Sequence, residues 1–185
     1  VSASLRARDP HVSPDGKRIV FTRNRDGSTN LCLINRDGTG LVQLTDYEDG
    51  EQVYSPRWSP DGERLLFTIF AGEDRDIAMM RADSPPRPKD WGIRDRAARR
   101  GSASRIKNLI EADQDTVANV WHDSVAYPGA DTSGFRVVLG SNDDERDPYW
   151  LPDGTGFVFA SDPTGIFNIY RYDLEDAGVT QLTNV

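Results

Sequence analysis

A repeated Pro-Asp-Gly motif constrains the fold of this chain more than any other feature of its sequence. The motif closes three similar segments, and in each a second proline lies five positions before the aspartate. The three segments are 9–16, 55–62 and 147–154. Self-similarity at a fixed spacing is the signature of repeat architectures, in which each unit is one supersecondary element.

The agreement between the three copies continues beyond the motif. Counted from the aspartate, a phenylalanine follows at 6 residues, an Asn or Asp at 15, and in two copies a Leu-Thr pair at 29 and 30. These positions hold Phe21, Phe67 and Phe159, then Asn30, Asp76 and Asn168, then Leu44–Thr45 and Leu182–Thr183. Agreement at so many offsets indicates a structural repeat that extends well past the turn.

Each copy is typical of four short strands. The first ends at Asp-Gly, which suits a tight hairpin turn because glycine adopts positive φ without a steric penalty. Its prolines are tolerated if this strand is a sheet edge. The second strand is continuously apolar, so both of its faces should be covered. The predicted second strands are 18–21, 64–67 and 157–159, the third 30–34, 76–80 and 168–172, and the fourth 42–45 and 180–183.

Four-stranded units at this spacing predict an all-β fold, the β-propeller. A closed ring needs about four to eight blades, so three blades are part of a larger ring. We therefore expect residues 1–185 to be a partial propeller of a six- to eight-blade ring, completed by the same polypeptide. The predicted blades are 9–49, 52–83 with 135–144, and 147–185.

One long insertion interrupts the middle blade. Residues 135–140 are interpreted as its delayed fourth strand, which leaves 84–134 as an insertion between the third and fourth strands. Long insertions cost little, because closure entropy grows only logarithmically with length. Apolar spacing predicts two short helices, at 104–113 and 116–125. The insertion also carries a basic cluster that would either grip an acidic peptide or domain or simply keep the loop solvated: Arg94, Arg96, Arg99, Arg100, Arg105 and Lys107.

Charged residues concentrate in the loops after the second and fourth strands. In an up-and-down blade these two connections lie at the same end of the sheet, so they should form one rim. Three interpretations stay open: a solvated surface, a site for Ca²⁺ or a cationic partner, and a protein-binding rim. The rim residues are Arg23, Arg25, Asp26, Glu48, Asp49, Glu73, Asp74, Arg75, Asp143, Asp144, Glu145 and Asp162.

The sequence offers little sign of catalysis. The Asp-Gly residues (Asp15–Gly16, Asp61–Gly62 and Asp153–Gly154) are interpreted as turn formers rather than metal ligands. His11 and His122 have no partners at zinc-site spacing, and neither a Gly-x-Ser-x-Gly elbow nor a phosphate-binding glycine loop occurs. Cys32, the single cysteine, is expected to be an apolar strand residue. We predict no catalytic residue, metal or cofactor in this chain.

Charge argues against nucleic acid as a partner, and hydropathy argues against a membrane-spanning segment. The net charge of −8 disfavours nucleic acid, whose phosphates require a basic surface. No apolar run approaches the ~20 residues that span a bilayer. A protein or peptide remains the expected partner.

The Ser-Pro-Asp-Gly motif after a proline–aromatic strand, followed by an apolar strand, Asn/Asp and Leu-Thr, resembles the TolB-type repeat family, relatives of the tryptophan–aspartate propellers. The resemblance covers 9–83 and 135–185, with Val12 in place of tryptophan and Leu151 in place of serine. It implies about six or seven blades and a periplasmic, cell-envelope or extracellular location. Members usually bind proteins, as TolB binds a peptidoglycan-associated lipoprotein.

The resemblance therefore favours a non-catalytic scaffold that binds a protein or peptide. One alternative is the gating propeller of a serine peptidase of the prolyl oligopeptidase or dipeptidyl peptidase type, with its catalytic domain outside this chain. A second alternative is a carbohydrate- or calcium-binding propeller.

Overall fold

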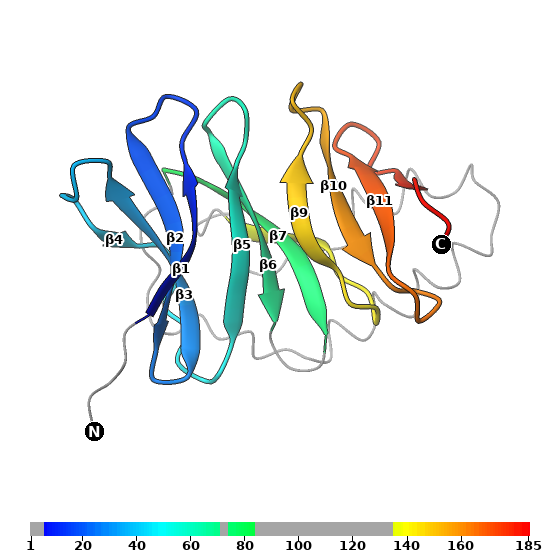
Figure 1. Cartoon of the computed structure of the whole chain (residues 1–185), viewed down its shortest axis with the longest axis horizontal. Helices are drawn as coiled ribbons and strands as arrows, with labels where there is room; N and C mark the ends of the chain where they lie inside the picture. The colour runs from blue at the N-terminus through cyan, green and yellow to red at the C-terminus, as the bar shows by residue number, and fades with distance from the viewer. Residues whose placement is uncertain (1–5, 71–73, 84–134) are drawn as a thin grey trace.

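The computed structural model describes residues 6–70, 74–83 and 135–185, and the regular structure within them is entirely β. The strands form three four-stranded antiparallel sheets, each ordered as in the chain (Figure 1). The first sheet contains β1 (Arg6–Val12), β2 (Arg18–Arg25), β3 (Ser28–Asn35) and β4 (Val42–Gln43). The second contains β5 (Gln52–Trp58), β6 (Arg64–Phe70), β7 (Arg75–Arg81) and β8 (Phe135–Leu139). The third contains β9 (Arg146–Trp150), β10 (Gly156–Ser161), β11 (Asn168–Asp173) and β12 (Val179–Gln181).

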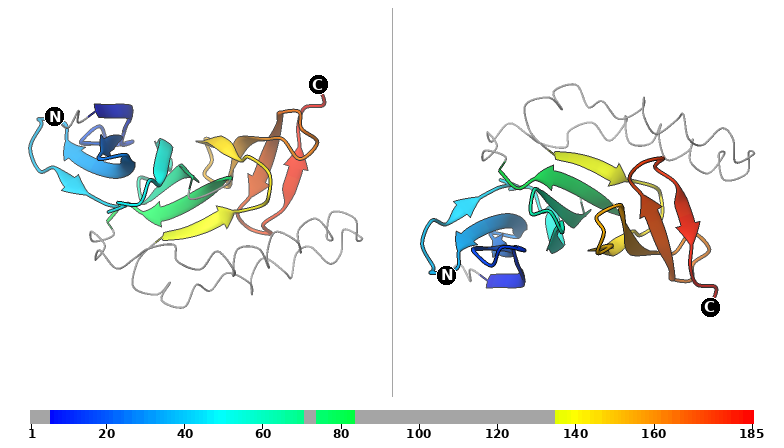
Figure 2. Two further views of the ribbon diagram at one scale, coloured as in Figure 1. Left: turned by 90° about the horizontal axis from the view of Figure 1, so that it is seen from below. Right: turned by 90° about the horizontal axis from the view of Figure 1, so that it is seen from above.

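The three sheets stand side by side like a fan, which is the arrangement of propeller blades (Figure 2). Their first strands, β1, β5 and β9, are neighbours across the blade boundaries. The all-β propeller fold is therefore as the repeat predicts. The strand expected at 135–140 is β8, and it pairs with β7, with Phe135 opposite Met80. The residues predicted as an insertion, 84–134, lie outside the described residues, and so do its two expected helices.

The first strand of every blade contains a bulge at its proline. The pairing register shifts there, and the residue before each proline, Asp9, Ser55 or Asp147, has a φ of 54°, 49° or 53°. Because proline has no N–H, a bulge keeps it out of the hydrogen-bond ladder. The edge position explains why proline is tolerated, but the left-handed residue before it was not anticipated.

The Pro-Asp-Gly turns are built alike in the three blades. Gly16, Gly62 and Gly154 have φ of 70°, 73° and 73°. Asp15 Oδ1 accepts hydrogen bonds from Ser13 Oγ at 2.6 Å and from the Lys17 amide at 3.0 Å, and these two bonds lower the pKa of Asp15.

The third turn keeps this geometry although Leu151 replaces the serine. Thr155 compensates: its amide and its Oγ1 both donate to Asp153 Oδ1, at 3.0 and 2.8 Å. The carboxylate therefore organises the turn with a hydroxyl from either side.

A second repeated element explains the Leu-Thr offset. Asn30 Oδ1 accepts from Thr45 Oγ1 at 3.0 Å and from the Tyr47 amide at 2.6 Å. Asn168 Oδ1 accepts from Thr183 Oγ1 at 3.1 Å and from a following amide in the same way. The third strand thus uses a buried Asn side chain to hold the exit of the fourth strand.

The core consists of two layers, one at each blade boundary. The first layer lies between the first and second blades, and the second layer lies between the second and third blades. The two faces of the middle blade therefore belong to different layers. Trp58 and Trp150, 3% and 5% exposed, occupy the same place in the two layers. The Arg18 and Arg64 guanidinium carbons lie 4.8 and 5.0 Å from the centres of these indole rings. Blade stacking, rather than any one sheet, buries the apolar side chains.

Candidate binding rim

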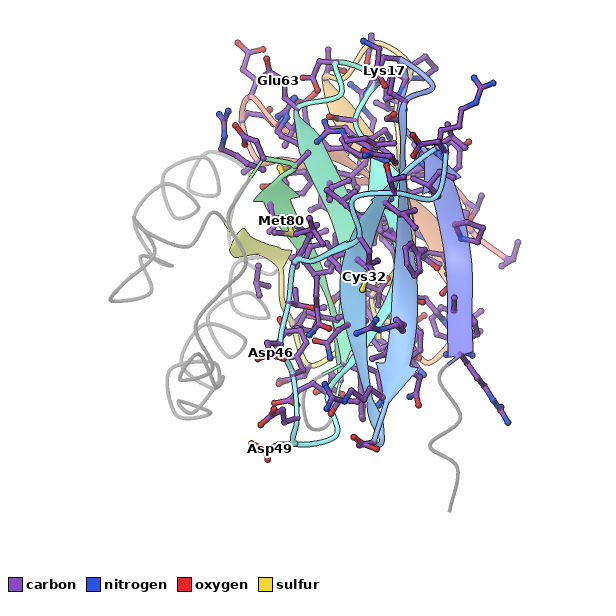
Figure 3. The ribbon with its side chains drawn as sticks, turned by 90° about the vertical axis from the view of Figure 1, so that its left-hand side faces the viewer. Lys17, Cys32, Asp46, Asp49, Glu63 and Met80 are labelled. Carbon is purple, nitrogen blue, oxygen red and sulfur yellow. The ribbon has the colours of Figure 1, made fainter. Side chains whose placement is uncertain are left out.

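The loop rim is the end of the sheets that carries the β2–β3, β4–β5, β6–β7, β8–β9 and β10–β11 connections. Figure 3 shows Asp46 and Asp49 at this end and Lys17 and Glu63, from the Pro-Asp-Gly turns, at the other. A backbone hydrogen bond joins the start of β3 to the β4–β5 loop. The Thr29 amide donates to Glu51 O at 2.9 Å. The predicted proximity of these two kinds of loop is therefore present.

The most organised part of the rim lies where the second and third blades meet. Arg75 Nη1 lies 3.0 and 2.7 Å from the two carboxylate oxygens of Asp144. The Asp144 amide donates to Asp162 Oδ1 at 3.0 Å. A strand start, the β8–β9 loop and the β10–β11 loop are thereby tied together. Both side chains of the ion pair remain partly exposed, at 37% for Arg75 and 26% for Asp144.

Aromatic rings fix the arginines of this region. The Arg75 guanidinium carbon lies 5.8 Å from the centre of the Tyr54 ring and 5.9 Å from that of Phe70. The Arg146 guanidinium carbon lies 3.5 Å from the centre of the Phe167 ring, and its Nη2 is 3.9 Å from Asp144. Such cation–π contacts limit the freedom of a charged side chain.

We call the group formed by Tyr54, Arg75, Asp144, Arg146 and Asp162 the junction patch. The sequence prediction omitted Tyr54 and Arg146 from the rim. The repeat itself carries the missed signal, because both residues stand seven positions before the Asp-Gly aspartate of their blades.

The other predicted rim residues do not join this patch. Arg25 and Asp26 form a local pair at 3.4 Å in the β2–β3 turn. Arg23 is half-buried, and its Nη2 donates to Gln43 Oε1 at 2.9 Å. Glu48 and Asp49 are exposed on the β4–β5 loop. The predicted rim is therefore divided between two blade junctions.

Two predicted rim aspartates flank the junction patch. Asp74 immediately precedes Arg75 and is half-buried. Asp143 precedes Asp144, and its amide donates to Ser141 Oγ at 2.9 Å. Outside the described residues lie Glu73 and the basic cluster Arg94, Arg96, Arg99, Arg100 and Arg105.

The assignment of Glu145 to the exposed rim is wrong. Its side chain is 3% exposed and points into the junction of the second and third blades, where Ser141 Oγ donates to its Oε1. Burial, reinforced by the negative charges of Asp76 and Asp143, raises the pKa of Glu145 to about 8. Glu145 occupies the repeat position of Val53, which is fully buried in the core between the first and second blades. This carboxyl is therefore inaccessible to a partner.

The remaining reactive side chains have structural surroundings. His11 Nδ1 accepts a hydrogen bond from the Trp58 amide at 3.0 Å, and burial, then Arg57, lowers the pKa of His11. Burial raises the pKa of the Cys32 thiol.

The described residues contain neither a metal-ligand cluster nor a membrane-spanning helix. Within residues 6–70, 74–83 and 135–185, no three His, Cys, Asp or Glu side chains converge in a way that could hold a metal ion. Across these ranges no helix is long and apolar enough to cross a bilayer.

Comparison with known proteins supports the propeller. The chain is 24% identical over 160 residues to the uncharacterized peptidase YuxL of Bacillus subtilis, a match that covers 86% of this chain and 22% of that protein. No family model matches the sequence. The chain therefore spans about a fifth of the length of this curated relative.

Solved structures with the same fold include TolB proteins and peptidases. TolB from Acinetobacter baumannii gives a TM-score of 0.59 at 20% identity, over 100% of this chain and 34% of that one. A putative TolB from Agrobacterium tumefaciens gives 0.61 at 17%, over 97% and 50%. A puromycin-hydrolyzing peptidase of Mycobacterium tuberculosis gives 0.60 at 16%, over 100% and 24%. These likenesses identify the fold of this chain as that of a β-propeller.

Proposed function

We propose that this chain is a non-catalytic propeller module that binds a protein or peptide through the junction patch. The observation that carries the proposal is the Arg75–Asp144–Asp162 network, which joins the start of β7 to two connections and is still partly open to solvent. Arginine and tyrosine are enriched at protein interfaces. Because the ring contacts already restrict Arg75 and Arg146, little side-chain entropy is lost when a partner binds.

The module belongs, in this proposal, to a larger ring in the same polypeptide. Equivalent positions support it: Leu31 and Ile77 are 0% exposed, whereas Ile169 in the third blade is 40% exposed. Leu44 is 1% exposed and its counterpart Leu182 is 52% exposed. A further blade would cover the apolar face of the third blade in the way that the third covers the second.

Removal of the two arginines of the junction patch tests whether this patch binds the partner. We expect the double variant Arg75→Ala/Arg146→Ala of the full-length protein to lose at least tenfold in affinity for its partner. The partner is first identified by crosslinking in the native host, and binding is then measured by calorimetry. The matched control is Lys17→Ala/Arg36→Ala, which removes two exposed cations at the opposite end of the sheets. Equal affinity of the two double variants would place the binding surface elsewhere.

A second candidate is the recognition or gating propeller of a serine peptidase. The match to the peptidase YuxL favours it, because that protein is more than four times longer than the segment it shares with this chain. The catalytic domain would then lie in another part of the polypeptide. Labelling of the full-length protein by a fluorophosphonate probe for active serines tests this reading. A protein that takes up no label and cleaves no peptide is not a serine peptidase.

The two remaining predictions have simple tests. A calcium-binding rim requires the melting temperature to rise with Ca²⁺ and fall with chelator, and an unchanged value removes that alternative. The envelope location suggested by the repeat resemblance is checked by fractionation of the native host.

A further inference from the structure

Among the described residues of the predicted loop rim, Glu145 is the one whose side chain is buried, at 3% exposed. It ends the β8–β9 loop (140–145), and its amide donates to Arg75 O at 2.9 Å. One carboxyl oxygen, Oε1, accepts the bond from Ser141 Oγ. The other, Oε2, is buried and has no hydrogen-bond partner among the described residues. A buried carboxylate without compensation is strongly disfavoured, whereas a protonated carboxyl is tolerated.

Among the described residues, the groups that face Glu145 offer it no positive charge. Asp76 faces it from β7 and Asp143 from its own loop, and both oppose ionisation. The nearby cation Arg75 is paired with Asp144. Arg146, the next residue, stacks on Phe167, and Asp162 of the β10–β11 loop accepts the Asp144 amide. Arg75 and Arg146, the two arginines of the junction patch, thus both lie at Asp144.

We propose that Glu145 is a proton-dependent latch, whose neutral carboxyl holds the β8–β9 loop closed on the junction of the second and third blades. Closing the loop takes up one proton, and opening releases it to solvent. The loop also carries Asp144, so the latch controls whether the junction patch is assembled. Opening and closing of the β8–β9 loop require no bound partner.

The direction of the pH effect follows from linkage. The pKa of Glu145 is raised from 4.5 to about 8 when the loop is closed. Between these two values the closed loop holds a proton that the open loop does not, so closure weakens as the pH rises. The open population should therefore increase about tenfold per pH unit across this window and level off above it. The open population of the loop therefore still changes with pH at neutral pH.

Hydrogen exchange of the intact protein tests the latch directly. Peptides that cover 140–147 are followed by mass spectrometry from about pH 5 to about pH 9, with intrinsic exchange rates divided out. We expect the opening constant of the wild-type loop to rise with pH and that of Glu145→Gln, a permanently neutral isostere, to stay flat. Glu145→Val restores the residue type of the preceding junction and should also be flat. Glu63→Gln, in an exposed turn at the opposite end, is the matched control and should keep the wild-type slope.

Infrared spectroscopy of the wild-type protein tests the latch without relying on the folding of any variant. The wild-type protein should show a protonated carboxyl band at neutral pH that disappears as the pH passes about 8. Its absence at neutral pH would overturn the proposal. A pH-independent wild-type loop would overturn it too, and so would a slope that persists in Glu145→Gln.

Discussion

The middle blade and the two outer blades share one repeat but differ in what covers them. In the middle blade, Leu65, Leu66 and Phe67 of β6 are all 0% exposed, so both faces are buried. In the first blade, the matching Ile19 and Phe21 are only half-buried. The same pattern of side chains is therefore a complete core in one blade and half a core in the others, because burial depends on a neighbouring blade.

The uncovered faces of the outer blades are opposite faces. The first blade is open where a preceding blade would pack, and Val12, the counterpart of Trp58, is 52% exposed there. The third blade is open where a following blade would pack. It carries Arg171, ion-paired with Asp173 at 3.1 Å, where the blades before it have buried Leu33 and Met79. Each blade thus has one face for the blade before it and another for the blade after it. The latter face is more polar in the third blade than in the first two.

The largest expected difference is in the second strands. Phe67→Ala should lower the free energy of unfolding by about 3–5 kcal/mol, because it empties a fully enclosed site. With the three blades alone, Phe21→Ala, at the same repeat position but half-buried, should cost less than half as much. Urea denaturation of both variants measures the two values. Equal losses would mean that the first blade is covered as completely as the second.

The leucines that directly follow the fourth strands, Leu44 after β4 and Leu182 after β12, extend the comparison. Leu44→Ala should cost about 2–5 kcal/mol, since Leu44 is 1% exposed. Leu182→Ala should cost less than about 1 kcal/mol if the third blade ends the array. In the full-length protein, a loss for Leu182→Ala that matches that for Leu44→Ala would show that another blade covers this face. Thermal denaturation of both variants in the same full-length background decides between these outcomes.

The two blade junctions should respond differently to acid. His11 bonds the Trp58 amide across the first junction, whereas the second junction uses Trp150 Nε1 and Arg57 O, at 3.4 Å, neither of which titrates near neutral pH. Because the folded pKa of His11 is lowered from 6.5, its stabilising effect is present above that value and is lost as the pH falls below it.

His11→Gln should remove this acid dependence, and His11→Ala should cost about 1–3 kcal/mol by leaving the Trp58 amide unpaired. Melting curves from neutral to mildly acidic pH measure both effects. An acid-induced loss that is unchanged in His11→Gln would assign it to another group.

The turns should show the smallest effects and no difference between blades. Gly16→Ala, Gly62→Ala and Gly154→Ala should each cost about 1 kcal/mol, since all three glycines have positive φ. No atom lies within 3.4 Å of a Cβ placed at any of the three, so the strain is confined to the backbone. Equilibrium unfolding of the three variants tests the equality. A much larger loss at Gly62 would mean that the middle turn depends on its neighbours.

Several features of the fold follow from local chemistry and were predictable. The turns at Asp61–Gly62 and its equivalents form because glycine permits their φ and the aspartate bonds nearby groups. The strand at 135–140 was recognisable by its apolar run, and β8 is found there beside β7. The bulge at Asp9 and its equivalents was not predicted, although the proline that follows it marked the place.

The candidate site was predictable only in part. Loop order along an up-and-down blade correctly indicated that Arg75, Asp144 and Asp162 come to one end of the sheets. The same reasoning wrongly assigned Glu145 to the solvent, because a charged residue in an acidic loop is usually exposed.

By itself, the sequence determined the repeat, its turns and its four-stranded units, since these depend on φ preferences and on the alternation of side chains along a strand. Only the tertiary structure decided which apolar faces are covered and which charges meet. Arg75, at the start of β7, and Asp144, in the β8–β9 loop, form their ion pair although they lie far apart in the chain. Burial of Glu145 likewise depends on the contact between two blades, because the solvation of a side chain is set by what packs against it in space.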